Sequence, residues 1–538
     1  FFYLSLKGLG LIFFKITQVK NFQSETIYPI ISFPLIFIIT TTLHFFIKLH
    51  PNINIFIIIV GFLVYIFRLK KNQNFFLIFL ILIIVLIQFI GHKVNEDFGY
   101  YHLPYIINFV SDKLIFGLSH LSMVQGYNSA WLNISSLFYL PIMLDKSVHF
   151  ANSLIFLSLF VYYCSFLIKK DNISNFPLSS LYAILALSFF IIKNSRLNSF
   201  GVDVPGHMYS SLVFFLFLNF YENKDYEFRK NTFYLISIFS VFCILIKLSY
   251  IPLIFFPLIC LFFEKKILEK KILIILFVLS IPWIIQQIAY TSCVIFPLDF
   301  TCLKLLPWYS KSFINDAAFS LEYINKSYWV YEGSFTEKEY VENFNWVKTW
   351  FSRNLIELSE NILAFILPLI LLIIFNYRGN KEQKKNIKNK SLVVFMIPII
   401  IGLGIWFLKA PVIRYGIFYI NTIIFLIFLL LFKEKLFFKF NRKFILTVLI
   451  FSLAFNITKN VNRISHVKYY KDFPFPEIQK IVYKTEIIGN FNFHTPIKLN
   501  DPQSGVCWNT PIYCRPGDYD GLNIEKKRGY LIITDKLN

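Results

Sequence analysis

Charged residues are scarce in this sequence: Asp, Glu, Lys and Arg make up only 16% of its 538 residues. Hydrophobic residues account for 56%, and the mean hydropathy is +0.59. This composition excludes a soluble globular protein and a disordered chain, because neither class has so large an apolar fraction. We therefore expect a membrane protein with many spans.

Several motifs of well-known enzymes are also missing. The sequence contains no P-loop or other Gly-rich phosphate loop, no nucleophile elbow and no spacing typical of metal ligands. Internal repeats are not evident. Charges are nearly absent from the middle of the apolar runs, whereas transporters tend to place ionisable residues there.

The net charge of +22 and the 66 Phe residues need separate explanations. The basic residues fall in short loops between apolar runs, so we assign them to membrane orientation and expect no nucleic-acid partner. Phe, Ile, Lys and Asn are abundant together, which is typical of an AT-rich genome. The sequence begins with Phe inside an apolar run, so we expect it to lack its N-terminal residues.

The apolar runs have the length that a bilayer core of about 30 Å requires of a helix. They predict about 13 to 14 transmembrane helices and an all-α membrane domain over residues 1–457. The predicted spans are a partial one at 1–14 and then 27–49, 54–69, 74–91, 147–168, 178–193, 206–221, 233–248, 250–263, 271–290, 361–377, 391–408, 415–432 and 443–457.

Basic residues in short loops predict which way the spans run. When the spans simply alternate, seven basic loops fall on one side, which we assign to the cytoplasm. They contain Lys15 and Lys20; Arg68, Lys70 and Lys71; Lys169 and Lys170; Lys224, Arg229 and Lys230; and residues 264–271, 378–390 and 433–443.

The opposite, extracytoplasmic side then receives all the long segments. These are the external loops 92–146 and 291–360, the shorter connections 194–205 and 409–416, and residues 458–538. The last segment predicts a small extracytoplasmic C-terminal αβ cap.

Four of the seven Cys lie on this predicted outer side, as two close pairs. Cys293 pairs in sequence with Cys302, and Cys507 with Cys514. An oxidising outer compartment favours a disulfide for each pair, and zinc is the alternative. No clustered His accompanies either pair.

The stretch "NEDFGYYHLP", at the head of the first long external loop, gathers groups that could carry chemistry. Glu96 and Asp97 are adjacent, so they point in different directions on a helix. Tyr101 and His102 follow about one turn later and add a hydroxyl and an imidazole. The alternative is an interfacial loop with solvated acids.

Three further charged residues lie near the predicted outer ends of spans. Asp203, in "FGVDVPGHMYSS", either belongs to a site or begins the next helix. Lys247 and Arg414 are cations at a depth where a lipid-linked phosphate would need them. Snorkelling anchors explain the two cations equally well.

These features together resemble the GT-C class of polytopic membrane glycosyltransferases, which use polyprenyl-phosphate-linked sugars. An acid just after a span in the first external loop, followed by amphipathic segments, carries the resemblance. More narrowly, the chain resembles an uncharacterised bacterial membrane family. Its pattern is met by Asp97, "YHLP" at 101–104, "GLSH" at 117–120, "NSAW" at 128–131, "SCVIFPLDFTCLKLLPW" at 292–308, "APVIRYG" at 410–416 and "CWNTPIYC" at 507–514. The short segment after the last span departs from the class, because it has no lectin-like character.

By this resemblance Asp97 would be the catalytic base, with Glu96 as its competitor. Arg414 and Lys247 would hold the leaving phosphate, while Tyr101, His102 and Asp203 would bind or orient sugar and acceptor hydroxyls. The resemblance implies sugar transfer with inversion, at the extracytoplasmic face of a bacterial inner membrane, to a glycan, lipid or protein acceptor. We expect no cofactor, with a divalent metal as the less favoured alternative.

Two alternatives remain open from the sequence. One is an O-antigen-type polymerase or ligase, for which the large external loop 291–360 would carry the essential Lys and Arg residues. The other is a transporter or flippase of lipid-linked glycans. Membrane lipid and a polyprenyl-phosphate sugar are the expected partners in the favoured interpretation.

Overall fold

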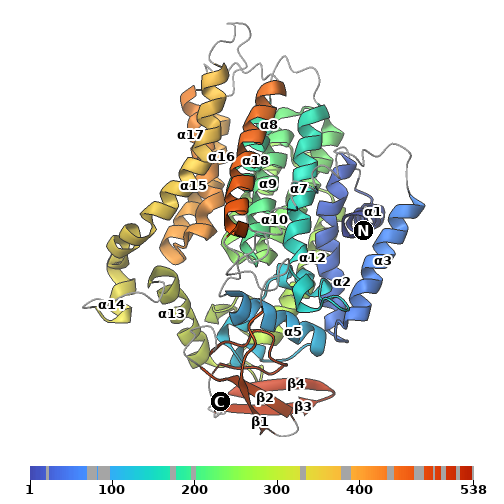
Figure 1. Ribbon diagram of the computed structural model, residues 1–538, viewed down its shortest axis with the longest axis vertical. Coiled ribbons are helices and arrows are strands. Elements are labelled where there is room, and N and C mark those ends of the chain that lie inside the picture. Colours follow the sequence, from blue (N-terminus) through green and yellow to red (C-terminus); the bar gives the residue numbers. More distant parts are fainter. Residues whose placement is uncertain are drawn as a thin grey trace.

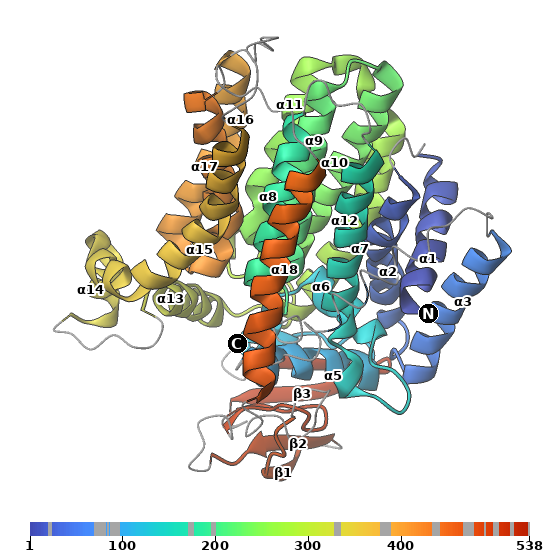
Figure 2. The ribbon, with the colours of Figure 1, turned by 45° about the horizontal axis from the view of Figure 1, so that its top comes forward.

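Helices dominate the computed structural model of this chain. It describes residues 1–19, 24–68, 82, 86, 97–169, 177–194, 201–327, 335–376, 389–432, 442–465, 478–488, 491–498, 505–516 and 521–535. Most of the long helices run side by side along the longest axis, and the strands gather at one end (Figure 1). Figure 2 shows the same separation from another direction.

The helices of the bundle bury long apolar runs against one another. α9 is its central helix, since every residue from Val204 to Phe220 is buried, as expected for a helix that is apolar on all sides. In chain order the bundle contains α1 (Phe2–Thr17), α2 (Tyr28–His44), α3 (Pro51–Phe67), α7 (Phe150–Lys169), α8 (Leu178–Lys193), α9 (Asp203–Glu222), α10 (Tyr226–Ile246), α11 (Phe255–Phe263), α12 (Lys270–Thr291), α15 (Trp346–Asn376), α16 (Asn389–Lys409), α17 (Ile413–Phe432) and α18 (Arg442–Ser465).

Seven helical stretches among the described residues are long and apolar enough to cross a membrane. They are Glu25–His44, Asp145–Ile168, Tyr226–Ile246, Lys270–Thr291, Trp346–Leu371, Ser391–Lys409 and Ile413–Leu431. Shorter apolar helices cover Pro51–Phe67, Leu178–Lys193 and Leu248–Phe263. The expectation of a mostly helical chain with helices able to span a membrane is thus confirmed, whereas the count of about 13 to 14 spans stays a prediction. α9 and α18 were both expected to span and are not among the seven.

Some predicted boundaries were wrong. The span predicted at 361–377 belongs to a helix that begins at Trp346, so the second external loop is shorter than 291–360. The helix extends because Trp346 and Trp350, one turn apart, both pack on Phe407 of α16. α18 continues to Ser465, beyond the predicted 457. The span predicted at 250–263 begins as the 3-10 helix η6 (Leu248–Ile254). Apart from Leu82 and Leu86, the span at 74–91 lies outside the described residues.

Two predicted basic loops meet at one end of the bundle, which we call the basic end. Arg229 pairs with Glu264 at 3.8 Å, and Lys230 pairs with Glu269 at 2.5 Å. These pairs join the start of α10 to the segment before α12, where η7 (Lys265–Ile267) lies. Residues 378–388 and 433–441, which belong to two other predicted basic loops, lie outside the described residues.

The other end of the bundle, which we call the Asp97 end, collects the short helices. The segment predicted as the first external loop forms a π-helical turn and several short helices, and the segment predicted as the second forms a further group. They are η2 (Phe98–His102), α5 (Leu103–Ser111), η3 (Leu118–His120), η4 (Met123–Gly126), α6 (Ala130–Leu137), η5 (Asp145–Ser147), η8 (Asp299–Thr301), α13 (Lys311–Ser327), α14 (Glu337–Val341) and η9 (Glu342–Phe344). The remaining element, η1 (Glu25–Ile27), leads into α2.

Two antiparallel hairpins close the Asp97 end (Figures 1 and 2). β1 (Tyr483–Ile488) pairs with β2 (Phe491–Pro496), and β3 (Leu522–Lys527) pairs with β4 (Tyr530–Asp535). Phe116 joins the second hairpin through backbone hydrogen bonds: its N–H donates to Leu531, and its carbonyl accepts from Ile533, both at 2.9 Å. Within the described residues from 478 onward this region contains strands and no helix, so only the β part of the predicted αβ cap is seen.

Candidate functional site

Four charged side chains from distant parts of the sequence meet at the Asp97 end. Arg414 lies between two carboxylates: its Nη2 is 2.9 Å from Oδ2 of Asp97, and its Nε is 3.1 Å from Oδ2 of Asp203. Lys247 completes the set, with its Nζ 2.6 Å from Oδ1 of Asp203. We call these four residues the charged cluster. Its two acids and two cations balance one another formally.

Neither carboxylate of the charged cluster caps a helix. Asp97 precedes the π-helical turn η2, and its side chain makes no capping hydrogen bond there. Asp203 is the first residue of α9, whose N-cap position is Val202. Asp203 does begin the next helix, as one of the two sequence interpretations expected, and it also belongs to the charged cluster. Both carboxylates instead point to Arg414. The π-helix is rare, and single turns of it occur frequently at functional sites.

Arg414 is the second residue of α17, and hydrogen bonds hold the short connection from α16 that leads into it. The indole N–H of Trp350 donates to the carbonyl of Pro411 at 2.5 Å, and that of Trp406 donates to Val412 at 2.7 Å. Nε2 of His207, on α9, bonds to the carbonyl of Arg414 itself. Because a buried carbonyl without a donor is costly, these three rings fix the backbone from which the guanidinium projects.

Lys247 reaches the charged cluster because α10 ends there. Its backbone leaves the helix with φ −157° while its N–H still donates to Cys243. Its Nζ lies 3.0 Å from the centre of the Tyr415 ring, which places the ammonium on an aromatic face. Sequence reasoning did not single out Tyr415; its position next to Arg414 in "APVIRYG" was the available signal.

Tyr101 and His102 lie beside the charged cluster in different protonation environments. Burial, followed by the Asp97 carboxylate, raises the pKa of Tyr101 well above its ordinary value. Burial lowers the pKa of His102 to about 4, against the opposing influence of Asp97 and Asp203. At neutral pH Tyr101 is therefore a neutral phenol and His102 a neutral imidazole, so each can donate or accept a hydrogen bond.

The ring of His102 is buried, with only 4% of the residue exposed, yet neither ring nitrogen has a hydrogen-bond partner among the residues that the structure describes. It packs on Gly201, which has φ +41° and where a Cβ atom would come within 2.0 Å of the ring. Gly201 was not predicted as part of the site, although a Gly just before Asp203 was a visible signal. Buried polar atoms in native proteins are almost always paired, so the two nitrogens are groups that a ligand could satisfy.

The charged cluster is more open on one side than on the other. The Asp97 and Arg414 side chains are 27% and 34% exposed, whereas Asp203 and Lys247 are 14% and 20% exposed. The Asp97–Arg414 pair therefore faces the accessible side. Glu96, the predicted competitor of Asp97, lies outside the described residues. The structure brings together six of the predicted site residues; what each of them does stays a prediction.

An apolar cavity lies next to the charged cluster, inside the bundle. It is small, with about 20 Å³ open to a water molecule, and is lined by side chains of α8, α9, α15 and α17. His207 is common to the cavity wall and the Arg414 backbone contact. Asn421 also lines the cavity, and its side-chain oxygen has no partner.

Two of the motifs that carry the narrower resemblance serve the architecture. In "GLSH", Ser119 donates to the carbonyl of Tyr290, and His120 bonds to that of Trp308. In "NSAW", the indole of Trp131 donates to Asn152, and Asn128 donates to the carbonyl of Trp283. These contacts tie the first external loop to α7, α12 and the segment after α12.

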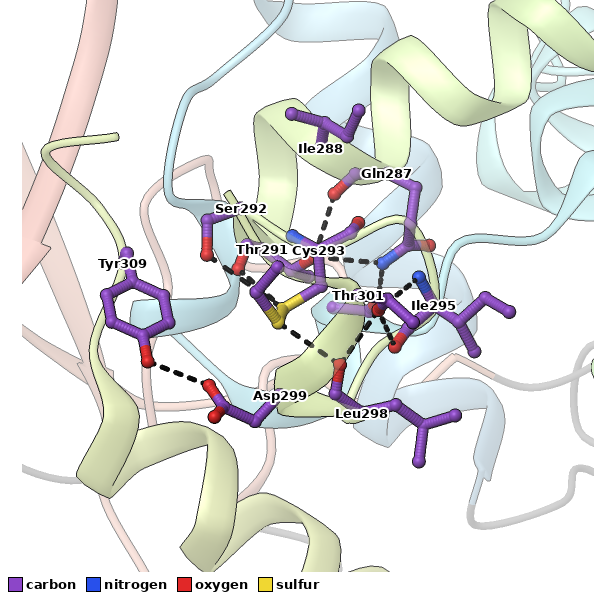
Figure 3. The surroundings of a disulfide bond; sticks show 12 residues. Gln287, Ile288, Thr291, Ser292, Cys293, Ile295, Leu298, Asp299, Thr301 and Tyr309 are labelled. Atoms are coloured by element: carbon purple, nitrogen blue, oxygen red, sulfur yellow. Dashed lines mark hydrogen bonds between the residues drawn. A yellow bond between two sulfur atoms is a disulfide. The ribbon is translucent and has the colours of Figure 1, made fainter. Parts of the chain in front are cut away.

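Both predicted disulfides are present. Cys293 is bonded to Cys302, and Cys507 to Cys514, while Cys164, Cys243 and Cys260 are free. Figure 3 shows the first bond in a tight loop after α12, where Tyr309 donates to Asp299 and Thr301 bonds back to the carbonyls of Ile295 and Leu298. No group of three or more His, Cys, Asp or Glu residues placed to hold a metal is found in the described parts of the chain.

The fold and the charged cluster define a helical protein whose apolar helices could cross a membrane and whose charged groups converge at one end. The chain belongs to the family described as "Domain of unknown function (DUF8201)", whose profile matches residues 1–421. No curated protein and no solved structure matches it.

Proposed function

We propose that this chain is an integral membrane glycosyltransferase of the GT-C type. It would transfer a sugar from a polyprenyl-phosphate donor to a glycan, lipid or protein acceptor at the extracytoplasmic face of a bacterial inner membrane. The observation that carries the proposal is the charged cluster, in which residues 97, 203, 247 and 414 meet. The same four positions were selected from sequence: Asp97 as a base, Asp203 as a group that orients sugar or acceptor hydroxyls, and Lys247 and Arg414 as cations for a lipid-linked phosphate.

The location of the charged cluster suits a substrate with an apolar chain and a polar head. Asp203 begins the central helix α9, and Arg414 lies at the start of a stretch able to cross a membrane. The cluster offers cations for the phosphate, at the end of a bundle of apolar helices. A purely structural ion-pair network would have no need of an adjacent unpaired imidazole such as His102.

The proposed step is a single displacement. The acceptor oxygen attacks the anomeric carbon as the bond from that carbon to the phosphate oxygen breaks, and the configuration inverts. The acceptor proton passes to the carboxylate of Asp97, and polyprenyl phosphate leaves with the electron pair. A positioned base typically contributes about 10²–10⁴-fold to such a rate.

Sharing of Arg414 by two carboxylates couples proton transfer to departure of the phosphate. When Asp97 accepts the proton its charge is lost, and the Nη2 contact to Arg414 weakens. The cluster then carries one net positive charge at the moment when negative charge develops on the leaving phosphate. Lys247 and Asp203 hold the other side of the guanidinium in place, so little reorganisation is needed.

The polymerase or ligase alternative needs free cations in the second external loop. Two of the cations in the segment predicted as that loop, Lys326 of α13 and Arg353 of α15, are committed to packing. Lys326 pairs with Glu322 at 2.6 Å, and Arg353 donates to the backbone carbonyls of Lys326 and Ser327. These contacts join α13 to α15, which favours a structural role for them.

The deciding experiment is complementation of a deletion strain, scored by the surface glycan profile at matched protein level. We expect Asp97→Asn to lose the glycan, because it keeps the size of the side chain and removes the base. Glu96→Gln and the double variant test the neighbouring acid. Glu337→Gln is the matched control, since it makes the same chemical change at an exposed position of α14.

Full activity of Asp97→Asn and of the double variant would refute the proposal and favour a transporter. Loss of the glycan on substitution of Lys304 or Lys311, with Asp97 dispensable, would favour the polymerase or ligase.

A further inference from the structure

The backbone next to Asp97 is in direct contact with a residue some 400 positions later in the chain. The Trp508 ring lies on Gly99, so closely that a Cβ atom at Gly99 would be 2.3 Å from the ring. The backbone N–H of Trp508 donates to the carbonyl of Gly99 at 2.8 Å. Its ring also meets Phe98 edge-on, with the two ring centres 6.2 Å apart. Only 1% of Trp508 is exposed.

The loop that presents Trp508 is closed and anchored. The disulfide between Cys507 and Cys514 closes it, and a hydrogen bond from Thr510 N–H to the Cys507 carbonyl crosses it. His494 of β2 joins it on one side: its N–H donates to Tyr513 and its carbonyl accepts from Arg515. A loop fixed in this way can impose a position on the backbone that it touches.

The same loop reaches two other points of the first external loop. The Tyr513 hydroxyl donates to Asp112 at 2.6 Å, directly after α5. The Asn509 amide donates to Asp145 at 3.3 Å, in η5. Trp508 thus contacts the start of the segment that carries Tyr101 and His102, and its neighbours in the loop contact the far end of α5 and η5.

We propose that Trp508 is a positioning residue for Asp97, resting on the proposed function in which Asp97 is the base. Asp97 immediately precedes the π-helical turn η2. Gly99, two residues away, is covered by the Trp508 ring and bonded to the Trp508 backbone, so this contact sets where the π-helical turn and its preceding carboxylate lie. Misplacement of a catalytic group by about 1 Å can lower a rate by about 10²-fold.

The test changes the size of the side chains at positions 508 and 99, singly and together, and has two readouts. We expect Trp508→Ala to lower the surface glycan by about tenfold or more at matched protein level, while Trp508→Phe keeps a ring on Gly99 and retains activity. Gly99→Ala should be equally harmful in the wild-type chain and add nothing in the Trp508→Ala background, because the obstructing ring is then gone. Asn509→Ala, in the same disulfide loop, is the matched control.

The second readout is hydrogen exchange of the backbone at residues 98–103 in the purified protein, which does not depend on any substrate. We expect exchange there to be faster in Trp508→Ala and unchanged in Asn509→Ala. Unchanged exchange in Trp508→Ala would overturn the inference. If exchange in Trp508→Ala is faster but its surface glycan is normal, while Asp97→Asn abolishes the glycan, the inference is overturned and the proposed function stands. A harmless Asp97→Asn would overturn the proposed function and, with it, the role given to Trp508.

Discussion

At the scale of single residues, one guanidinium serves two carboxylates. Arg414 uses Nη2 for Asp97 and Nε for Asp203, which lie on different elements. Lysine has a single ammonium group and cannot reproduce this forked geometry. The side chain is about one-third exposed, so solvent screens the two pairs in part and their joint contribution is smaller than that of a fully buried network.

We therefore predict that Arg414→Lys lowers the free energy of unfolding by about 1–2 kcal/mol, mainly through a lost charge-assisted hydrogen bond. Thermal unfolding of the purified protein measures it. Lys409→Met is the control, since Lys409 is 71% exposed and 3.5 Å from Glu322, and it should change stability by less than about 0.5 kcal/mol. Equal effects of the two substitutions would contradict a specific role for the contact of Arg414 with both Asp97 and Asp203.

At the scale of elements, the turn between α16 and α17 is fixed by indole rings from two helices. Trp350 belongs to the first half of α15 and Trp406 to the end of α16, and their N–H groups bond successive carbonyls of the turn, Pro411 and Val412. Gly416 lies under the Trp406 ring, which leaves no room there for a side chain. The unexpected early start of α15 is thus what brings Trp350 to the Arg414 backbone.

Trp350→Phe should keep most of the packing and leave the Pro411 carbonyl without its donor. We expect the protein to be less stable by about 1–3 kcal/mol, the cost of a buried unsatisfied polar group. Trp346→Phe is the comparison, because Trp346 is equally buried and its indole donates no hydrogen bond among the described residues. A smaller loss for Trp350→Phe than for Trp346→Phe would argue against the role of this hydrogen bond.

Sequence reasoning reached those site residues whose charge or position was unusual for a membrane chain. Asp97, Asp203, Lys247 and Arg414 stand out because charged residues are few in so apolar a sequence and these four lie beside apolar runs. Tyr415 and Gly201 did not stand out, because aromatic residues and glycine are common in such chains and only the folded geometry places them on Lys247 and His102. The contact of Trp508 with Gly99 joins segments too distant in sequence for any local pattern to reveal.

The helices, too, divide into parts that the sequence predicted and parts that only the folded structure reveals. Apolar run length predicted the approximate location of most of the described long helices, but it fails where a helix continues as a more polar segment. The charged first half of α15 reads as loop because it lacks an apolar run, and it is helical through its packing on α16. Pairing of Phe116 with the C-terminal hairpin is a long-range backbone contact that hydrophobic periodicity cannot predict.

At the scale of the whole molecule, the two ends of the bundle differ in chemistry. The basic end carries Arg229, Lys230 and the turn before α12, whereas the Asp97 end carries the charged cluster, both disulfides and the hairpins. The sequence assigns the first to the cytoplasm and the second to the outer face. Placement of the two ends on opposite sides of a membrane is therefore the simplest prediction to test.

Single cysteines at the two ends test this arrangement. We expect Lys484→Cys, on the exposed strand β1, to react with a membrane-impermeant maleimide in intact cells. Lys266→Cys, exposed at the basic end, should react only after permeabilisation. The parent chain gives the background from its free Cys164, Cys243 and Cys260. Reaction of both variants in intact cells, or the reverse pattern, would contradict the predicted topology.

The seating of Trp508 on Gly99 and the pairing of Phe116 with β4 have a consequence for biosynthesis. The ribosome delivers the first external loop early, and its final partners follow only after another several hundred residues. At about 5–20 residues per second, the loop waits for roughly 20–80 s without them. Throughout that interval the nascent chain has most of its helices but an uncovered loop, which makes a chaperone on the same side of the membrane as that loop valuable during this period.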